Sequence, residues 1–280
     1  MTYCVAVKLD AGLVFLSDSR TNAGLDQIGS FRKMMIYERA GERFMVMLSA
    51  GNLSISQQVR EILQIEELRE VKESGEESPP ITIWNAKSMF DAARVLGSAV
   101  RHVYDRDAEA LKHAGLDFNV SFVFGGQVKG EGMRLFLVYA AGNFIEATTE
   151  TPYFQVGESK YGKPVLDRML RPSTPLDEAA KCVLVSMDST LKSNLSVGLP
   201  LDLAVYEVNR LESGQIVCID DRNPYFQMIR SSWGEKLRQA FEPIDDPQWD
   251  ADGTAAAPLC VPSQRYETMR KITHPGEKIV

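Results

Sequence analysis

The second residue of the chain is a threonine whose hydroxyl and α-amine could both take part in catalysis. The sequence begins Met1-Thr2, and methionine aminopeptidase tends to remove an initiator methionine that precedes a small residue. Thr2 would then carry a nucleophilic Oγ beside a free amine that can act as its base. An α-amino group titrates near pKa ~7.7 to 8.0, so a sizeable fraction is unprotonated at neutral pH. The first residues therefore permit catalysis by a terminal nucleophile.

The residues after Thr2 favour this interpretation over that of an ordinary chain start. Many cytosolic chains begin Met-Thr, and most domains begin with a few poorly ordered residues. Here alternating small and apolar residues start at once, and they predict a strand over residues 2–9. We therefore expect the N-terminus to be built into the fold.

Two charged residues could activate the threonine hydroxyl. Asp18 follows a second predicted strand, residues 13–17, which a turn at residues 10–12 folds back beside the first strand. Lys33 stands at the start of a later strand, after a polar loop. A nearby ammonium would lower the pKa of the hydroxyl and keep the amine neutral by like-charge repulsion, while Asp18 would hold the lysine. Taken singly, Asp18 with Arg20 is equally typical of a turn-capping pair, and Lys33 of a solvated strand end.

A third candidate is the turn Ser49-Ala50-Gly51, where a predicted strand runs into a predicted helix. Backbone N–H groups at a helix start carry partial positive charge, which suits an oxyanion, and glycine lets a substrate carbonyl approach closely. We expect Gly51 to supply such a donor. The alternative interpretation is that the turn from strand to helix requires glycine at position 51. This interpretation is compatible with the role of oxyanion donor.

Composition and charge exclude several classes of function. The 280-residue chain is 44% hydrophobic and has a net charge of -7. Phosphate binding needs a basic face, so a nucleic-acid partner is not expected. No apolar run approaches the length of a membrane span, and the chain does not start with a signal peptide. We therefore expect no membrane partner and a cytoplasmic location.

Cysteine and histidine usage does not indicate a metal or redox site. The four cysteines are widely scattered, and the three histidines lack ligand spacing. Reduced, buried thiols in a cytosolic protein are the better interpretation. No metal, no cofactor and no Ser-His-Asp triad are expected.

The order of the predicted elements indicates an α+β fold. Strands are predicted at 2–9, 13–17, 33–38, 43–48, 119–127, 133–140, 144–147, 153–156, 201–208 and 215–219, and helices from 53, at 89–103, 161–170, 175–192 and 225–237. The predicted order is strands, two helices, strands, two helices and strands. Two packed antiparallel sheets whose outer faces are covered by helices would give this order. We predict one domain over residues 1–242 and an extended or disordered tail over 243–280, which is rich in Pro, Asp and Gly.

The candidate residues occur in the order and approximate spacing of proteasome β-type subunits; they are Thr2, Asp18, Lys33 and the turn at residues 49–51. The chain therefore resembles this family of N-terminal-nucleophile (Ntn) hydrolases. More narrowly, it resembles the bacterial homologues of these subunits. The segments that carry the resemblance are Met1–Val7, Ser17–Gly24, Leu48–Leu53 and Gly157–Pro164. The resemblance implies a four-layer αββα sandwich. It also implies Thr2 as nucleophile, Lys33 and Asp18 as its activating pair, and Gly51 as oxyanion donor.

The chain departs from the family pattern at two further positions. Family members complete the site with a serine in a Gly-Ser-Gly turn and with a later aspartate that a serine follows three residues on. Here the turn reads Gly157-Glu158-Ser159, so Ser159 is a shifted substitute for the family serine. Asp188 matches the later aspartate, but Leu191 stands three residues after it. Glu158 could raise the pKa of the amine and weaken the base, or it could face a neighbouring subunit.

The resemblance implies a self-compartmentalising threonine peptidase that hydrolyses amide bonds through an acyl-enzyme ester on Thr2. Family members form stacked rings or open spirals, so a homo-oligomer acting on peptides or proteins is implied. Genes for an ATP-grasp enzyme and a transglutaminase-like protein commonly neighbour those of the bacterial homologues, which makes their products candidate partners. Two alternatives stay open: a small-molecule Ntn amidase, since function lives in the site and not in the fold, and a non-catalytic scaffold subunit that keeps Met1.

The mass of the mature chain separates the scaffold from the enzymes. We expect the purified protein to have lost one methionine, because only then is the α-amine of Thr2 free to act as a base. Intact-mass spectrometry measures this directly. A chain that retains Met1 would rule out both enzymatic interpretations.

Overall fold

The computed structural model describes residues 2–22, 28–69 and 79–247. By its internal contacts the chain divides into two compact units, Met1–Ser231 and Ser232–Val280. The larger unit contains every candidate site residue. In the smaller unit the described residues comprise the second half of α5 (Pro224–Phe241) and irregular chain up to residue 247. Most of the predicted tail, residues 248–280, lies outside the described residues.

The first sheet of the larger unit has five antiparallel strands in the order β10-β1-β2-β11-β12. Its members are β1 (Tyr3–Leu9), β2 (Gly12–Asp18), β10 (Tyr153–Gly157), β11 (Leu201–Glu207) and β12 (Gln215–Ile219). Almost every residue of β1 and β2 is buried. These two strands are covered on both faces, which explains why their sequences are nearly continuous apolar runs. The residue after Met1 therefore lies at the end of a central strand.

The second sheet also has five antiparallel strands, in the order β5-β6-β7-β8-β9. Its members are β5 (Met34–Arg39), β6 (Arg43–Gly51), β7 (Val120–Val128), β8 (Arg134–Val138) and β9 (Phe144–Glu146). Successive residues of β6 belong to different cores, because strand side chains alternate between faces. Phe44 and Val46 pack between the sheets, whereas Met45 and Met47 pack under the helices α1 (Leu53–Leu63) and α2 (Met89–His113).

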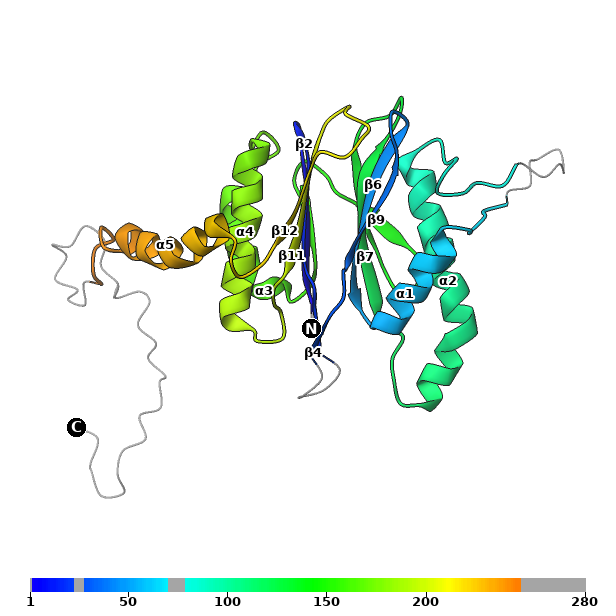
Figure 1. Ribbon diagram of the computed structural model, residues 1–280, viewed down its shortest axis with the longest axis horizontal. Coiled ribbons are helices and arrows are strands. Elements are labelled where there is room, and N and C mark those ends of the chain that lie inside the picture. The colour runs from blue at the N-terminus through cyan, green and yellow to red at the C-terminus, as the bar shows by residue number, and fades with distance from the viewer. Residues whose placement is uncertain (1, 23–27, 70–78, 248–280) are drawn as a thin grey trace, which may run out of the picture. The chain divides into compact units, whose positions relative to one another are not determined.

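The two sheets pack face to face, and a helix pair covers each outer face (Figure 1). The helices α3 (Ser159–Met169) and α4 (Leu176–Ser193) cover the first sheet, and α1 and α2 cover the second. The predicted α+β class and the four-layer αββα sandwich are confirmed. Among the described residues, no helix combines the length and apolar character needed to span a membrane.

One hairpin was not predicted from the sequence. Residues 20–22 and 28–30 form the short antiparallel strands β3 (Arg20–Asn22) and β4 (Ile28–Ser30), where a polar loop was expected. The three polar residues of β3 and the Ile-Gly-Ser of β4 are too short to show an alternating apolar pattern, so these strands lack the signal by which the others were recognised. The hairpin leads the chain from Asp18 in the first sheet to Lys33, which immediately precedes β5 in the second.

Candidate active site

Thr2 lies directly before β1, at the lower edge of the two sheets, where the N-terminus is marked in Figure 1. The N–H group of Glu158 donates to the carbonyl oxygen of Thr2 at 2.7 Å. The preceding residue, Gly157, pairs in register with Tyr3 and has a φ of +83°, and a Cβ at this position would overlap the carbonyl oxygen of Thr2. The end of β10 therefore fixes the backbone of Thr2, and only glycine allows this close approach.

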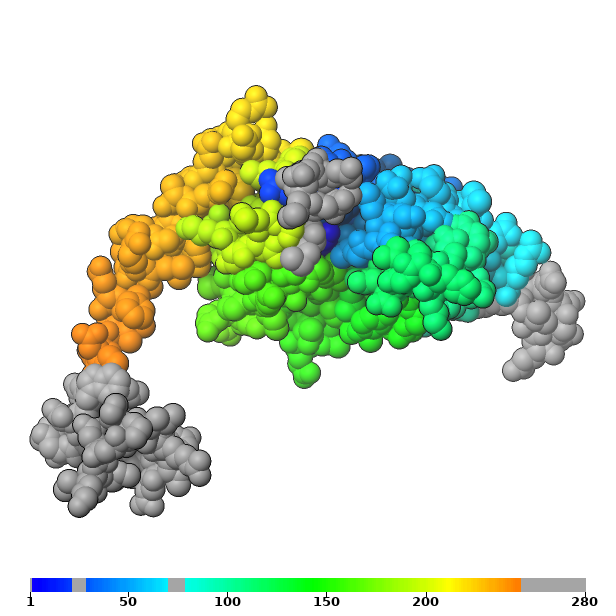
Figure 2. Space-filling view, turned by 90° about the horizontal axis from the view of Figure 1, so that it is seen from below, coloured from blue at the N-terminus to red at the C-terminus, as the bar shows by residue number. Residues whose placement is uncertain are grey.

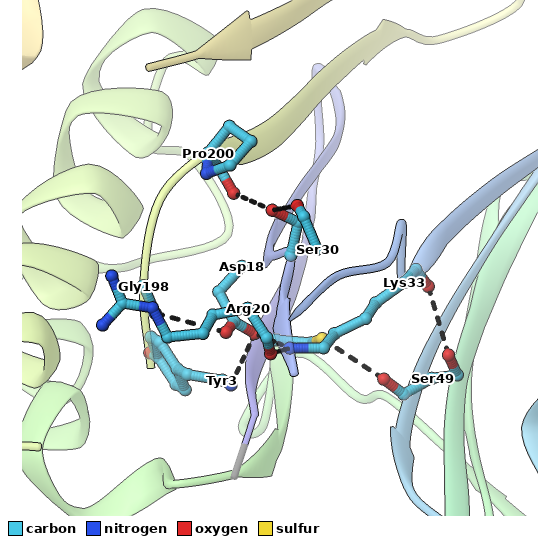
Figure 3. A network of polar contacts seen from close by, with 10 residues as sticks. Tyr3, Asp18, Arg20, Ser30, Lys33, Ser49, Gly198 and Pro200 are labelled. Atoms are coloured by element: carbon cyan, nitrogen blue, oxygen red, sulfur yellow. Dashed lines mark hydrogen bonds and ion pairs between the residues drawn. The ribbon is translucent and has the colours of Figure 1, made fainter. Parts of the chain in front are cut away.

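Asp18 and Lys33 form a buried ion pair beside this terminus (Figure 3). The ammonium of Lys33 lies 2.6 Å from Oδ1 of Asp18 and 2.6 Å from the carbonyl oxygen of Arg20. Lys33 is 6% exposed and Asp18 is fully buried. The same Oδ1 accepts the N–H of Tyr3 at 3.1 Å. The carboxylate therefore connects the lysine to the residue that follows Thr2.

The carboxyl group of Asp18 is subject to opposing electrostatic effects. Burial raises its pKa, because an ionised carboxyl loses hydration. The adjacent Lys33 ammonium and the N–H groups of Tyr3 and Gly198 act in the opposite direction. The N–H of Gly198 reaches Oδ2 at 3.4 Å. The lysine is thus the principal group that favours the charged form of this carboxyl.

The backbone of Lys33 is held by the second sheet. Its carbonyl oxygen accepts the N–H of Ser49 at 3.0 Å, and Ser49 lies near the end of β6, just before the turn to α1. The thiol of Cys4 on β1 contacts the carbonyl oxygen of Ser49 at 3.6 Å. Figure 3 shows the lysine side chain extending from the segment before β5 toward Asp18. The side chain therefore bridges the two sheets.

A cavity of about 1070 Å³ opens beside Thr2. Its lining residues come from both sheets, from α1 and from the segment before β7, and they are Thr2, Arg20, Thr21, Lys33, Ser49, Ala50, Gly51, Asn52, Leu53, Ser56, Leu116, Asn119, Ser121, Gly157 and Glu158. Figure 2 views the molecule from below and shows dark-blue N-terminal residues between yellow-green residues and the lighter blue of α1. Thr2 therefore borders a space large enough for a peptide segment.

Gly51 lines this cavity in a conformation that requires glycine. Its φ is +105°, and a Cβ would overlap the carbonyl oxygen of Asn119. The next residue, Asn52, caps α1, because its side chain accepts the N–H of Ser54 at 2.9 Å. A glycine at the start of a capped helix matches the position that the sequence suggested for an oxyanion donor.

The structure brings four of the six candidate residues together and leaves two apart. Ser159 is the first residue of α3, and Asp188 lies on α4 with its carboxylate 3.5 Å from Nε of Arg230. Burial raises the pKa of the Asp188 carboxyl, and Arg230 opposes this effect. Neither residue is among those that line the cavity, whereas Glu158 is.

No sequence pattern predicted that the segment joining α4 to β11 contacts the site. Besides the contact of Gly198 with Asp18, the carbonyl oxygen of Pro200 accepts the hydroxyl of Ser19 at 2.7 Å. The carbonyl oxygen of Leu195 accepts Nη1 of Arg20 at 3.0 Å. These contacts are made by backbone groups of a turn, so no side-chain pattern could have indicated them.

A second, smaller hollow of about 70 Å³ shares Ser49, Leu53 and Ser56 with the large cavity. Its other lining residues are Phe31, Arg32, Met35, Met47, Gln57 and Arg60. A side chain of a bound molecule could enter it from the large cavity. Within the described ranges, no group of three or more His, Cys, Asp or Glu residues could hold a metal ion.

Comparison with solved structures identifies close relatives. The structure of Anbu (ancestral beta-subunit) from Yersinia bercovieri is 48% identical, with a TM-score of 0.79, and the match covers 89% of this chain and 100% of that one. Anbu from Hyphomicrobium sp. strain MC1 is 46% identical over 88% of this chain and 99% of that one, with a TM-score of 0.76. The helical assembly of the Anbu complex from Pseudomonas aeruginosa is 44% identical over 88% and 98%, with a TM-score of 0.79. No protein-family model matches the sequence, and no curated protein is significantly similar to it.

Substitution of Gly157 tests the packing of the terminus. Gly157→Ala should reduce the free energy of unfolding more than Gly130→Ala, by at least about 1 kcal/mol. Both glycines have a positive φ, but a Cβ at Gly130 meets open space and one at Gly157 meets Thr2. Urea denaturation of both variants measures the difference. Equal losses would show that the backbone of Thr2 is not held by this contact.

The ion pair predicts a pH-dependent loss of stability. Lys33→Met leaves Asp18 buried without its counter-ion, which should reduce the free energy of unfolding by about 3–5 kcal/mol at pH 7. Without the lysine, burial keeps the folded pKa of Asp18 above its unfolded value of about 3.9. The folded variant then binds a proton that the unfolded chain releases, so its stability falls as the pH rises above about 4.

The free energy of unfolding that Lys33→Met loses relative to the wild type should therefore be smaller at about pH 4.5 than at pH 7. Denaturation of both proteins at both pH values measures this difference. Arg39→Met is the matched control, because its pair with Glu42 is about half exposed on both sides and should contribute less than about 1 kcal/mol. A loss for Lys33→Met that is equal at both pH values would contradict the assignment of a charged buried pair.

Proposed function

The chain belongs to the Anbu family of proteasome-like proteins, and we propose that it is a threonine peptidase subunit that hydrolyses amide bonds through an acyl-enzyme on Thr2 after removal of Met1. One observation carries the proposal. Thr2 and Lys33 line the same cavity, and the lysine is held by the buried Asp18. A purely structural subunit has no evident need for a buried charge pair beside its terminus.

The proposed reaction begins at the hydroxyl of Thr2. The free α-amine takes the proton from Oγ, and Oγ attacks the substrate carbonyl carbon. The Lys33 ammonium stabilises the developing negative charge on Oγ and disfavours a second positive charge on the amine. Asp18 keeps the ammonium in place.

The N–H of Gly51 is proposed to stabilise the oxyanion of the tetrahedral intermediate. Donors of this kind contribute about 2.7–4 kcal/mol to the transition state in acyl transfer. As the amide C–N bond breaks, the amine of Thr2 returns its proton to the leaving nitrogen. Water then attacks the ester, with the same amine accepting its proton, and the acid is released with regeneration of the Thr2 hydroxyl.

Ser159 and Asp188 do not line the cavity, so this scheme gives neither of them a step of its own. Glu158 lines it, so its carboxylate is proposed to act on the amine as an acidic neighbour. An opposite charge favours the protonated amine and raises its pKa. Glu158 and Lys33 would then have opposing effects on the base.

We propose a peptide or protein as the substrate and a homo-oligomer as the working form. The cavity volume of about 1070 Å³ slightly exceeds the ~300–1,000 Å³ that small-molecule sites occupy, which favours a peptide over a small amide. The relative from Pseudomonas aeruginosa is described as a helical assembly, and we extend self-assembly to this chain. A cytoplasmic location belongs to the same proposal.

A covalent probe tests the function directly. A peptide epoxyketone, which reacts with both the hydroxyl and the amine of a terminal threonine, should add one equivalent of its mass to the full-length protein. Peptide mapping should place the adduct on Thr2. The control is Thr2→Ala, which retains a small residue after Met1 and should form no adduct.

Absence of an adduct in a wild-type protein with a free Thr2 amine would contradict the peptidase proposal. It would favour the amidase or the scaffold. Modification of the Thr2→Ala variant to the same extent would show that the probe reacts elsewhere and would also contradict it.

A further inference from the structure

A second ion pair lies beside the first and involves the residue that precedes Lys33. Nη1 of Arg32 is 2.8 Å from Oδ1 of Asp202 on β11. The arginine side chain is 68% exposed, whereas the aspartate side chain is only 7% exposed. An exposed loop residue therefore reaches a carboxylate that is buried in the first sheet.

The position of Asp202 places it between the two sheets. It lies opposite Ser17 on β2, and Ser17 lies opposite Cys4 on β1. Cross-strand partners point to the same face of a sheet. The thiol of Cys4 contacts Ser49 of the second sheet, so Asp202 faces the second sheet as well.

Asp202 is poorly explained as a stabilising residue. Its Oδ2 and the Oγ of Ser17 are buried and have no hydrogen-bond partner among the described residues. Burial raises the pKa of the Asp202 carboxyl, and Arg32 opposes this effect. A half-satisfied buried carboxylate is unfavourable in a strand where an apolar residue would pack well. The residue is therefore better explained by what it does to Arg32.

Arg32 lies in the irregular segment that delivers Lys33 to Asp18. The segment before it is attached next to the first sheet, because the N–H of Phe31 donates at 2.8 Å to the carbonyl oxygen of Ser19, the residue directly after β2. The segment after it is attached to the second sheet through the contact of Lys33 with Ser49. The Arg32–Asp202 ion pair is a third attachment, and it joins the residue directly before Lys33 to β11 of the first sheet.

We infer that Asp202 is a positioning residue for Lys33 and acts through Arg32. The pair fixes the backbone of residue 32 against the first sheet, so that the adjacent lysine reaches both Asp18 and the carbonyl oxygen of Arg20. The inference rests on the proposed function, because positioning of Lys33 affects a rate only if Thr2 reacts. Asp202 itself touches neither the nucleophile nor the cavity.

The test compares Asp202→Asn and Arg32→Gln with wild-type protein in the epoxyketone reaction. Both variants should reduce the maximal rate of Thr2 modification by about tenfold to a hundredfold, since small displacements of catalytic groups have effects of this size. For Asp202→Asn the probe concentration at half-maximal rate should stay within about twofold, because Asp202 lines neither the large cavity nor the smaller hollow, whereas Arg32 lines the hollow. The double variant should be no slower than the slower single variant.

Two further variants separate positioning from general damage. Arg32→Lys keeps a cation that can reach Asp202 and should recover part of the rate. Glu146→Gln removes the charge of the partly exposed pair with Arg134 at the opposite edge of the second sheet and should react like the wild type. Because Arg32 is exposed, Arg32→Gln is expected to fold even if Asp202→Asn does not.

Wild-type rates in both Arg32→Gln and Asp202→Asn would overturn the inference. A wild-type protein without any Thr2 adduct would contradict the proposed function instead. In that case a crystal structure of full-length Arg32→Gln tests the inference, because it shows where the side chain of Lys33 lies. Loss of the 2.6 Å contact between Lys33 and Arg20 supports positioning by the pair, and an unchanged contact overturns it.

Discussion

The buried ion pair of Lys33 and Asp18 is the interaction on which the site depends. Two charges removed from water lose hydration worth several kcal/mol each, and close pairing with additional hydrogen bonds is needed to compensate. The carbonyl oxygen of Arg20 and the N–H groups of Tyr3 and Gly198 supply those bonds. Each comes from a different segment of the chain. The charge pair therefore forms only when the first sheet, the β3–β4 hairpin and the α4–β11 segment are all in place.

The four-layer fold brings these segments together at one edge of the two sheets. The β1–β2 hairpin places Asp18 beside the chain start, and β6 holds Lys33 from the opposite sheet through Ser49. Gly157, at the end of β10, has no side chain, so the backbone of β10 approaches Thr2 closely enough for the N–H of Glu158 to donate to the carbonyl oxygen of Thr2. Thr2, Lys33 and the glycine turn thus border one cavity. This geometry, together with family membership, is what supports a hydrolase.

Local pattern predicted much of the fold and part of the site. Asp18 could be placed near the terminus because a hairpin is a short-range feature, and the helices and most strands showed clear periodicity. The β3–β4 hairpin was missed because its strands have only three residues each and show no apolar alternation. The contacts of Asp202 with Arg32 and of Gly198 with Asp18 join residues about 170 to 180 positions apart, which no local pattern can indicate. Asp188 was chosen by its spacing along the sequence, and the structure places it on α4 against Arg230 of α5.

In the proposed mechanism Lys33 keeps the amine of Thr2 neutral so that it can serve as a base. The pKa of this amine in the mature protein can be measured by a ¹⁵N NMR titration of selectively labelled threonine. We expect a value below the ordinary range of about 7.7 to 8.0, which rises when Lys33 is replaced by methionine. A value above that range, unaffected by the loss of Lys33, would contradict it and would identify Glu158 as the dominant neighbour.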